Sequence, residues 1–179
     1  MGTSKQLLRI DGESLVRRAA QTALASRCAS VFVVLGAQAD GVAKELEGLT
    51  VTLVQRSRWQ EGIGSSIRVA VEAVAAADPP FDAVLITLVD QPTVTAALLD
   101  QLIAAGATAP AGLVACEYAG TVGVPSLFAR RYFDELRALG GDRGGKTVLA
   151  AQADAVVRIP FAPAAIDLDT PEDYRQFTR

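Results

Sequence analysis

Residues 83–92 read AVLITLVDQP, and this stretch carries the strongest strand signal of the chain. Its first seven residues form a run rich in Val, Ile and Leu, which predicts a strand, and the run leads directly into Asp90. Ligands of open α/β sheets gather at the carboxyl ends of the strands. A carboxylate at this place can hold a magnesium ion, whereas an aspartate before Pro92 can also simply form a turn. Position alone leaves both interpretations of Asp90 open.

Strand-like and helix-like segments alternate along the rest of the chain. Residues 30–35 (SVFVVL) have the pattern of a strand buried on both faces. Further strands are expected at 51–54, 113–118, 124–128 and 156–159. Helices are expected at 15–26, 40–46, 65–77, 95–105, 129–138 and 146–153, and from Pro171 onward. This alternation predicts βαβ units, and therefore a single α/β domain over residues 1–179 with a mostly parallel sheet.

The composition excludes several classes of protein. Half of the 179 residues are hydrophobic and the formal net charge is −3, so we expect neither a disordered chain nor a nucleic-acid partner. No run of about 18 apolar residues is present, so no membrane span is expected. The chain has no histidine, which excludes histidine-based triads and metal sites. Cys28 and Cys116 are too few for a zinc site or a disulfide framework, and we expect a reducing, cytoplasmic setting.

Residues 167–173 read DLDTPED and allow two interpretations. Asp167 and Asp169 alternate along a short extended segment, so both side chains are expected on one side, where they could share a cation with Asp90. The other interpretation is a helix cap, with Thr170 or Asp169 as the N-cap and Pro171 in the first turn. The cap accounts for the Thr-Pro-Glu-Asp part but not for Asp167.

Two glycine-rich turns and one lysine could also carry chemistry. Residues 61–68 (EGIGSSIR) could offer N–H groups and hydroxyls to an anion or a base, although such turns are common. Residues 140–146 (GGDRGGK) could contact a phosphorylated substrate or form a mobile surface loop. Lys5 could bind phosphate or be an ordinary surface lysine. Each of these features is ambiguous by itself.

Taken in order, these segments resemble the molybdenum cofactor cytidylyltransferase-like branch of the nucleotidyltransferases. The matching segments are Met1-Gly2 with Lys5-Gln6-Leu7-Leu8, Gly64-Ser65-Ser66-Ile67-Arg68, Leu88-Val89-Asp90-Gln91-Pro92, Gly123-Val124-Pro125-Ser126-Leu127-Phe128, Gly141-Asp142-Arg143-Gly144 and Asp167-Leu168-Asp169-Thr170-Pro171-Glu172-Asp173. They cover essentially the whole chain. The resemblance implies a Rossmann-like three-layer nucleotidyltransferase fold, shared with the molybdopterin guanylyltransferases and the methylerythritol cytidylyltransferases.

The resemblance also implies a reaction and a set of site residues. A phosphate on the acceptor attacks the α-phosphate of a nucleoside triphosphate and pyrophosphate leaves, with magnesium as the cofactor. The implied transfer is of CMP from CTP to a phosphorylated molybdopterin-like cofactor, with a molybdenum hydroxylase as a candidate recipient of the product. The implied roles are catalysis for Lys5 and Asp90, nucleotide binding for Gly2, Lys5, Gly64, Ser65, Ser66 and Asp90, acceptor binding for Asp142, Arg143 and Gly144, and metal binding for Asp90, Asp167 and Asp169.

Two features depart from the family pattern. The family's G-H-P reads Gly123-Val124-Pro125 here, so any acceptor contact made by that histidine is absent. The family opens with L-A-A-G-x-S-x-R, a buried strand and a triphosphate loop, whereas this chain matches only from the methionine that follows. We therefore expect translation to begin upstream of Met1. A sheet built from residues 1–179 alone would lack its central strand and leave two inner edges unpaired.

Two other functions are compatible with these residues. One is a non-catalytic accessory or maturation protein that binds the molybdenum cofactor, and the other is a cytidylyltransferase for a different small phosphorylated acceptor. The presence of Asp90, Asp167 and Asp169 together favours an enzyme, because a binding protein has no need of this acidic set. Magnesium-dependent release of pyrophosphate would distinguish an enzyme from a binding protein.

Overall fold

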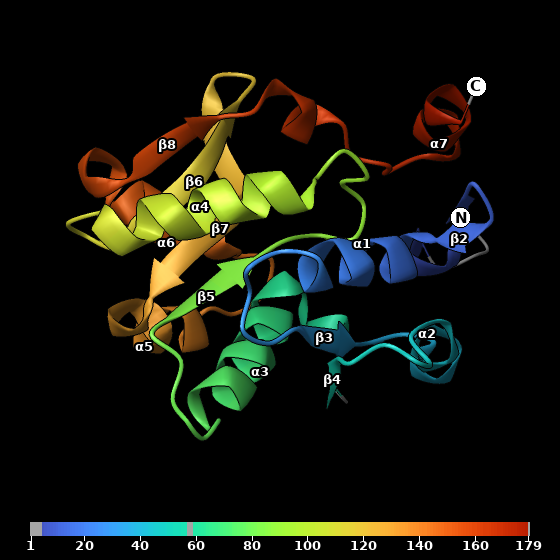
Figure 1. Ribbon diagram of the computed structural model, residues 1–179, viewed down its shortest axis with the longest axis horizontal. Coiled ribbons are helices and arrows are strands. Elements are labelled where there is room, and N and C mark those ends of the chain that lie inside the picture. The colour runs from blue at the N-terminus through green and yellow to red at the C-terminus, as the bar shows by residue number, and fades with distance from the viewer. Residues whose placement is uncertain (1–4, 57–58, 179) are drawn as a thin grey trace.

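The computed structural model describes residues 5–56 and 59–178, which form helices packed on both sides of β-strands (Figure 1). The strands of this part of the chain are β1 (Arg9–Ile10), β2 (Glu13–Ser14), β3 (Phe32–Leu35), β4 (Thr52–Gln55), β5 (Ala83–Ile86), β6 (Leu113–Tyr118), β7 (Thr121–Ala129) and β8 (Val157–Pro160). Its α-helices are α1 (Leu15–Leu24), α2 (Ala39–Glu45), α3 (Ile63–Ala75), α4 (Ala96–Thr108), α5 (Phe133–Arg137), α6 (Gly145–Ala151) and α7 (Pro171–Phe177). No helix within these residues is long and apolar enough to cross a membrane.

The four-stranded sheet has the order β5-β7-β6-β8. Strand β7 is antiparallel to both β5 and β6, while β8 is parallel to β6. The turn between β6 and β7 contains Ala119 and Gly120, whose φ angles of 47° and 72° are the left-handed values of a tight hairpin turn. The expected α/β fold is confirmed, and its pairing is mixed because β7 runs against its neighbours.

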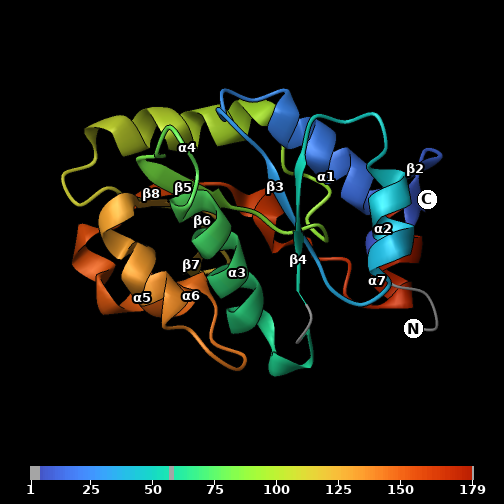
Figure 2. The same cartoon turned by 90° about the horizontal axis from the view of Figure 1, so that it is seen from below.

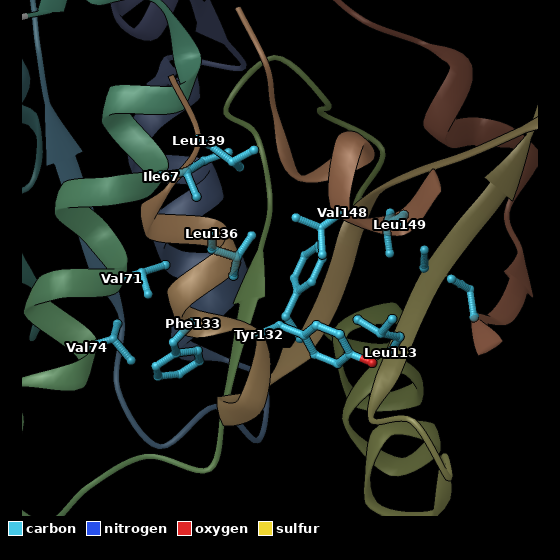
Figure 3. Packing of buried hydrophobic residues seen from close by; sticks show 13 residues of the cluster. Ile67, Val71, Val74, Leu113, Tyr132, Phe133, Leu136, Leu139, Val148 and Leu149 are labelled. Carbon is cyan, nitrogen blue, oxygen red and sulfur yellow. The ribbon is translucent and has the colours of Figure 1, made fainter. Parts of the chain in front are cut away.

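Helices cover this sheet on both faces. Successive side chains of a strand point to opposite faces, and β6 follows this rule. Leu113 and Ala115 belong to a core shared with α3, α5 and α6 (Figure 3), while Val114 and Cys116 pack against α4 and the end of α1. All four side chains are fully buried. Figure 2 shows the two helical layers on opposite sides of the strands.

Strands β3 and β4 form a separate parallel pair, in which Phe32 lies opposite Thr52 and Leu35 opposite Gln55. The buried Leu35 packs with residues of α1 and α2 in a cluster of its own. No strand of the described residues joins this pair to the four-stranded sheet, and the two stand apart in Figure 2. The sheet is therefore interrupted between β3 and β5, as expected for these residues.

Strands β3 and β5 are less buried than their sequences predict. Only Leu35 of β3 is buried, and all four residues of β5 are half-buried. Strand β5 also ends at Ile86, although the sequence predicts that it continues through residues 87–89. On one edge, pairing with β7 stops at Ile86 and Ser126, because Pro125 has no N–H to donate. The opposite edge has no strand partner among the described residues.

Candidate active site

Asp90 follows β5 and is tied to the segment before α7. Its carbonyl oxygen accepts a hydrogen bond from the backbone N–H of Leu168 at 3.0 Å. Helix α4 begins further on and is capped by Thr95, so Asp90 is not a helix cap. Oδ1 of Asp90 is buried and has no hydrogen-bond partner. Such an oxygen is unfavourable unless a donor or a cation joins it, so a turn alone does not account for this side chain.

The acidic segment before α7 divides into a helix cap and two further carboxylates. Thr170 is the N-cap and forms a capping box with Asp173, in which each side chain accepts a hydrogen bond from the other residue's backbone, at 3.1 and 2.8 Å. Leu168 is fully buried in a small apolar cluster and anchors the segment. The carboxylates of Asp167 and Asp169, on either side of this anchor, take no part in the cap. The cap interpretation is therefore confirmed for Thr170 and Asp173, and cation binding by Asp167 and Asp169 stays a prediction.

Lys5 lies between the carboxylates, in the short 3-10 helix η1 (Lys5–Leu7). Its Nζ donates to Asp169 and lies 3.7 Å from Oδ2 of Asp90. Burial by itself lowers the pKa of Lys5, but the hydrogen bonds and charges of Asp169 and Asp90 outweigh this effect and raise it. The amine is therefore protonated at neutral pH. It forms part of the carboxylate cluster rather than an isolated surface charge.

Asp167 carries a second buried oxygen, Oδ1, that has no hydrogen-bond partner. Burial raises the pKa of Asp167, and the nearby charge of Asp90 raises it further, although a hydrogen bond from Gln91 acts in the opposite direction. The folded protein thus pays a cost to keep Asp167 ionised beside another carboxylate. A cation between Asp90 and Asp167 would remove that cost.

Asp90 and Asp167 therefore fit a divalent cation. Each presents a buried oxygen without a donor, and magnesium takes oxygen ligands, using one or two carboxylates with water and substrate phosphates. Within the described part of the chain, no group of three His, Cys, Asp or Glu side chains is arranged as a complete metal site. Asp169 is paired with Lys5 instead, and its side chain is 64% exposed. The structure therefore brings the three predicted carboxylates together, and two of them, those of Asp90 and Asp167, are suited to a metal.

Gln91 and Tyr118 also belong to this cluster, although the motifs did not mark them as site residues. Gln91 is 4% exposed, and its Nε2 donates to the carbonyl oxygen of Ala164 at 3.0 Å. Its side chain also acts on Asp167 and Tyr118, where it lowers the pKa of each against the larger effect of burial. Burial and the charge of Asp167 raise the pKa of Tyr118, so its phenol stays protonated at neutral pH. In the sequence, Gln91 stands directly after Asp90 within the matching segment 88–92, but it was given no role of its own.

The turn before α3 and the loop before α6 form a second group. The N–H of Gly64 donates to the carbonyl oxygen of Gly141 at 3.0 Å. Ser65 is buried, and its Oγ donates to the carbonyl oxygen of Gly62 at 3.1 Å, so this hydroxyl is engaged within the turn. The expected nucleotide residues 64–66 and the expected acceptor loop 141–144 are thus brought together. Lys5 and the carboxylates form the other group.

Arg56, at the carboxyl end of β4, contacts the second group and was not predicted from the sequence. It donates from Nη1 to the hydroxyl of Ser66 and from Nη2 to the carbonyl oxygen of Gly62 at 3.0 Å. Burial lowers the pKa of Arg56, and the charge of Glu61 opposes this. A guanidinium remains protonated in proteins, so the turn before α3 has a fixed positive charge beside it.

The remaining predicted residues differ in how far the structure describes them. Asp142 and Arg143 are exposed on the loop before α6, and Gly144 is the half-buried N-cap of that helix. Gly2 lies outside the described residues. The loop therefore presents both charged side chains to solvent.

The close approach of the two turns predicts a stability effect at Gly64. A Cβ there would lie 2.9 Å from the backbone N of Gly140 and 3.0 Å from the carbonyl oxygen of Arg143, so the backbone must shift. We expect Gly64→Ala to lower the free energy of unfolding by about 1–3 kcal/mol, measured by thermal or urea denaturation. The control is Gly140→Ala, whose Cβ would meet nothing within 4 Å. Equal losses of unfolding free energy in the two variants would contradict the close approach of the two turns at Gly64.

The raised pKa of Asp167 predicts that its ionisation opposes folding. A carboxyl with a raised folded-state pKa favours folding below its unfolded pKa, and this contribution is lost as the pH rises through the folded value. We expect Asp167→Asn, in EDTA at pH 8, to have a Tm about 2–4 °C above the unchanged protein. The difference should shrink at acidic pH, where the unchanged carboxyl is protonated. A lower Tm for Asp167→Asn at pH 8 would show that the carboxylate stabilises the fold.

Comparison with known proteins identifies the family to which this arrangement belongs. The model of the MobA-like NTP transferase domain matches residues 1–156. The chain belongs to this family. It is therefore a nucleotidyltransferase by family, related to the molybdenum cofactor cytidylyltransferases, and the fold described above is the nucleotidyltransferase fold.

Individual relatives agree with this assignment. Purine catabolism protein PucB of Bacillus subtilis is 28% identical over 191 residues, which span 100% of this chain and 90% of PucB. The crystal structure of an Rv0371c homologue from Mycobacterium sp. strain JC1 is similar with a TM-score of 0.83 at 30% identity, covering 99% of this chain and 88% of that one. Rv0371c of Mycobacterium tuberculosis H37Rv, solved as a complex with manganese, has a TM-score of 0.81 at 26% identity, with 97% and 90% covered.

Proposed function

We propose that this nucleotidyltransferase transfers CMP from CTP to a phosphorylated molybdopterin-like cofactor and releases pyrophosphate. The observation that carries the proposal is the cluster of Lys5, Asp90, Asp167 and Asp169, in which two buried carboxylate oxygens have no donor. Such a cluster combines an ammonium suited to phosphate with a place for a divalent cation. In this proposal residues 1–179 act as one nucleotidyltransferase domain.

Magnesium is the proposed cofactor, with Asp90 and Asp167 as the residues that hold it. Support comes from their unpaired buried oxygens and from the manganese complex of the relative Rv0371c, since both ions favour oxygen ligands. When bound, magnesium neutralises the triphosphate and aligns the displacement. Asp169 is proposed to pair with Lys5 rather than with the metal, because the carboxylate of Asp169 already forms an ion pair with the Lys5 ammonium.

The proposed transfer is a single displacement. An oxygen of the acceptor's phosphate attacks the α-phosphorus of CTP, the bond from that phosphorus to the bridging oxygen of the β-phosphate breaks, and pyrophosphate leaves. Lys5 and Gly2 are proposed to bind the triphosphate. The turn at residues 64–66 and Arg56 are proposed to contact the base and ribose. These residues act mainly by positioning the reactants and stabilising charge.

The acceptor is proposed to bind at Asp142, Arg143 and Gly144. This loop lies directly beside the proposed nucleotide residues through the contact of Gly64 with Gly141, and an exposed guanidinium such as that of Arg143 can pair with a phosphate through two hydrogen bonds. A molybdenum hydroxylase is the proposed recipient of the product. Both cysteines of the chain are free, which suits the proposed cytoplasmic setting.

The test is a transfer assay with α-labelled CTP or GTP, molybdopterin and magnesium. We expect release of pyrophosphate and labelling of the cofactor with CTP, and loss of both when EDTA or no acceptor is added. Methylerythritol phosphate serves as the alternative small phosphorylated acceptor. Binding of molybdopterin without pyrophosphate release from either nucleotide would overturn the enzymatic proposal and favour an accessory role.

A further inference from the structure

Hydrogen bonds join the segment that follows β5 to the segment before α7, and we call them the clasp. They run from the N–H of Leu168 to the carbonyl oxygen of Asp90 at 3.0 Å, from Oγ1 of Thr93 to that of Pro163 at 2.9 Å, and from Nε2 of Gln91 to that of Ala164 at 3.0 Å. One segment carries Asp90 and the other carries Asp167, the two residues proposed to hold the metal. The clasp therefore brings the segments of both metal ligands together.

Gln91 contributes a deeply buried side chain to the clasp. It is 4% exposed, and its Nε2 also lies 3.5 Å from the carbonyl oxygen of Val124. The opposite orientation of the amide would place Oε1 against both carbonyl oxygens, so the direction of its N–H groups is fixed. Oε1 is buried and has no hydrogen-bond partner among the described residues, which is unfavourable. An apolar side chain would avoid this cost, so filling space does not account for a glutamine here.

We propose that Gln91 is a positioning residue, whose amide holds the carboxylate of Asp167 toward Asp90 so that one divalent cation meets both. The amide has two N–H groups. One bonds Ala164, and the contact with Val124 is at the limit of a hydrogen bond, so the second N–H is available to Asp167. Gln91 lowers the pKa of Asp167, as a donor beside a carboxylate does. This inference rests on the proposed metal site.

A neutral amide suits this place better than a charged donor. The charge of Asp90 raises the pKa of Asp167, because the two carboxylates repel each other, so a third group must hold them close before the metal binds. An ammonium or guanidinium could do so, but its charge would oppose the cation. The amide has no such charge. Oδ1 of Asp167, which has no partner in the described part of the chain, stays open to the metal, as in sites whose ligands are oriented by outer hydrogen bonds.

The first test is manganese binding by Gln91→Met, measured by electron paramagnetic resonance titration without nucleotide. Methionine keeps an unbranched side chain of similar length but has no N–H group. We expect the affinity for manganese to fall by about 10–100-fold, with folding of each variant checked by its Tm. The matched control is Thr93→Val, which removes another side-chain bond of the clasp and should bind manganese within about twofold of the unchanged protein. Equal losses in both variants would overturn the proposal, because the clasp as a whole would then set the affinity.

The second test asks whether Gln91 acts through Asp167. In an Asp167→Asn background, Gln91→Met should cause no further loss of manganese affinity, because the carboxylate that the amide holds is already absent. The turnover that Gln91→Met loses at low manganese should return as manganese is raised to saturation, so that the loss lies in the KM for the metal rather than in kcat. A full additional loss in the Asp167→Asn background, or a lower kcat with unchanged manganese affinity, would overturn the proposal.

A third measurement needs no variant and stands even if Gln91→Met does not fold. The side-chain NH₂ signals of Gln91 in nuclear magnetic resonance spectra should shift when magnesium is added, whereas those of Gln101, exposed on α4, should not. Unshifted Gln91 signals would overturn the proposal. If the unchanged protein bound no manganese, the proposed metal site would fail and this inference with it. If it bound manganese and Gln91→Met bound it equally well, only the role of Gln91 would fail.

Discussion

Asp90→Asn is expected to lower kcat/KM for pyrophosphate release by about 10²–10³-fold. The carboxylate of Asp90 combines a buried oxygen without a donor with an ion pair to Lys5. Asparagine keeps the shape of the side chain but removes its charge. The loss should therefore appear in the transfer step and in manganese binding, measured by electron paramagnetic resonance titration, while the fold is retained.

The matched control for this variant is Asp134→Asn. Asp134 is 92% exposed on α5 and forms an ion pair within its own helix, with Arg137 at 3.3 Å. The same chemical change there should leave both activity and manganese binding unchanged. If Asp90→Asn kept full activity, Asp90 would be no more than a turn residue and the proposed metal site would be wrong.

The positions of helices and strands could be predicted because local patterns determine them. Three features depend on neighbouring residues only: the spacing of apolar residues in α1, the apolar run of β3 and the cap at Thr170 and Pro171. The strand pairing could not be predicted in the same way. Alternation of strands and helices favours parallel pairing, but β6 and β7 form a hairpin through Ala119 and Gly120, which lacks the Asn-Gly or Asp-Gly signal.

The end of β5 shows how long-range pairing overrides a local pattern. Residues 87–89 continue the apolar run, yet they are outside the strand. Pro125, nearly forty positions later in the chain, ends the pairing with β7, and the other edge of β5 has no strand partner among the described residues. An apolar run forms a β-strand only where a neighbouring strand is available to pair with it.

The candidate site was predictable where its residues stand in motifs. Asp167 and Asp169 were expected to lie near Asp90 and Lys5 was expected to bind phosphate, and the structure places these four residues together. Gln91 is held in the site by a hydrogen bond to the carbonyl oxygen of Ala164, 73 positions away. Arg56 is held by a hydrogen bond to Gly62 in the turn before α3. Such contacts arise from the tertiary fold, so a single sequence carries no pattern that would reveal them.

Lys5→Met is expected to change activity and metal binding in opposite directions. Without nucleotide, the Lys5 ammonium lies with Asp90 and Asp169, where its charge opposes the approach of a second cation. Two unit charges at about 4 Å interact by about 1 kcal/mol in water, and Lys5 is partly exposed, so solvent screening applies. Removing the ammonium should therefore tighten manganese binding about fivefold in the absence of nucleotide.

The same variant should lose turnover because the triphosphate loses its ammonium partner. We expect kcat/KM to fall by about 10²-fold, and Lys5→Arg, which keeps the charge, to bind manganese as the unchanged protein does. Lys44→Met is the matched control, since Lys44 is an exposed lysine in the last turn of α2 and its loss changes the net charge equally. Weaker manganese binding by Lys5→Met would mean that the ammonium holds the carboxylates in place for the metal rather than competing with it. An unchanged turnover would mean that Lys5 does not bind the triphosphate, since loss of its ammonium would then leave catalysis unaffected.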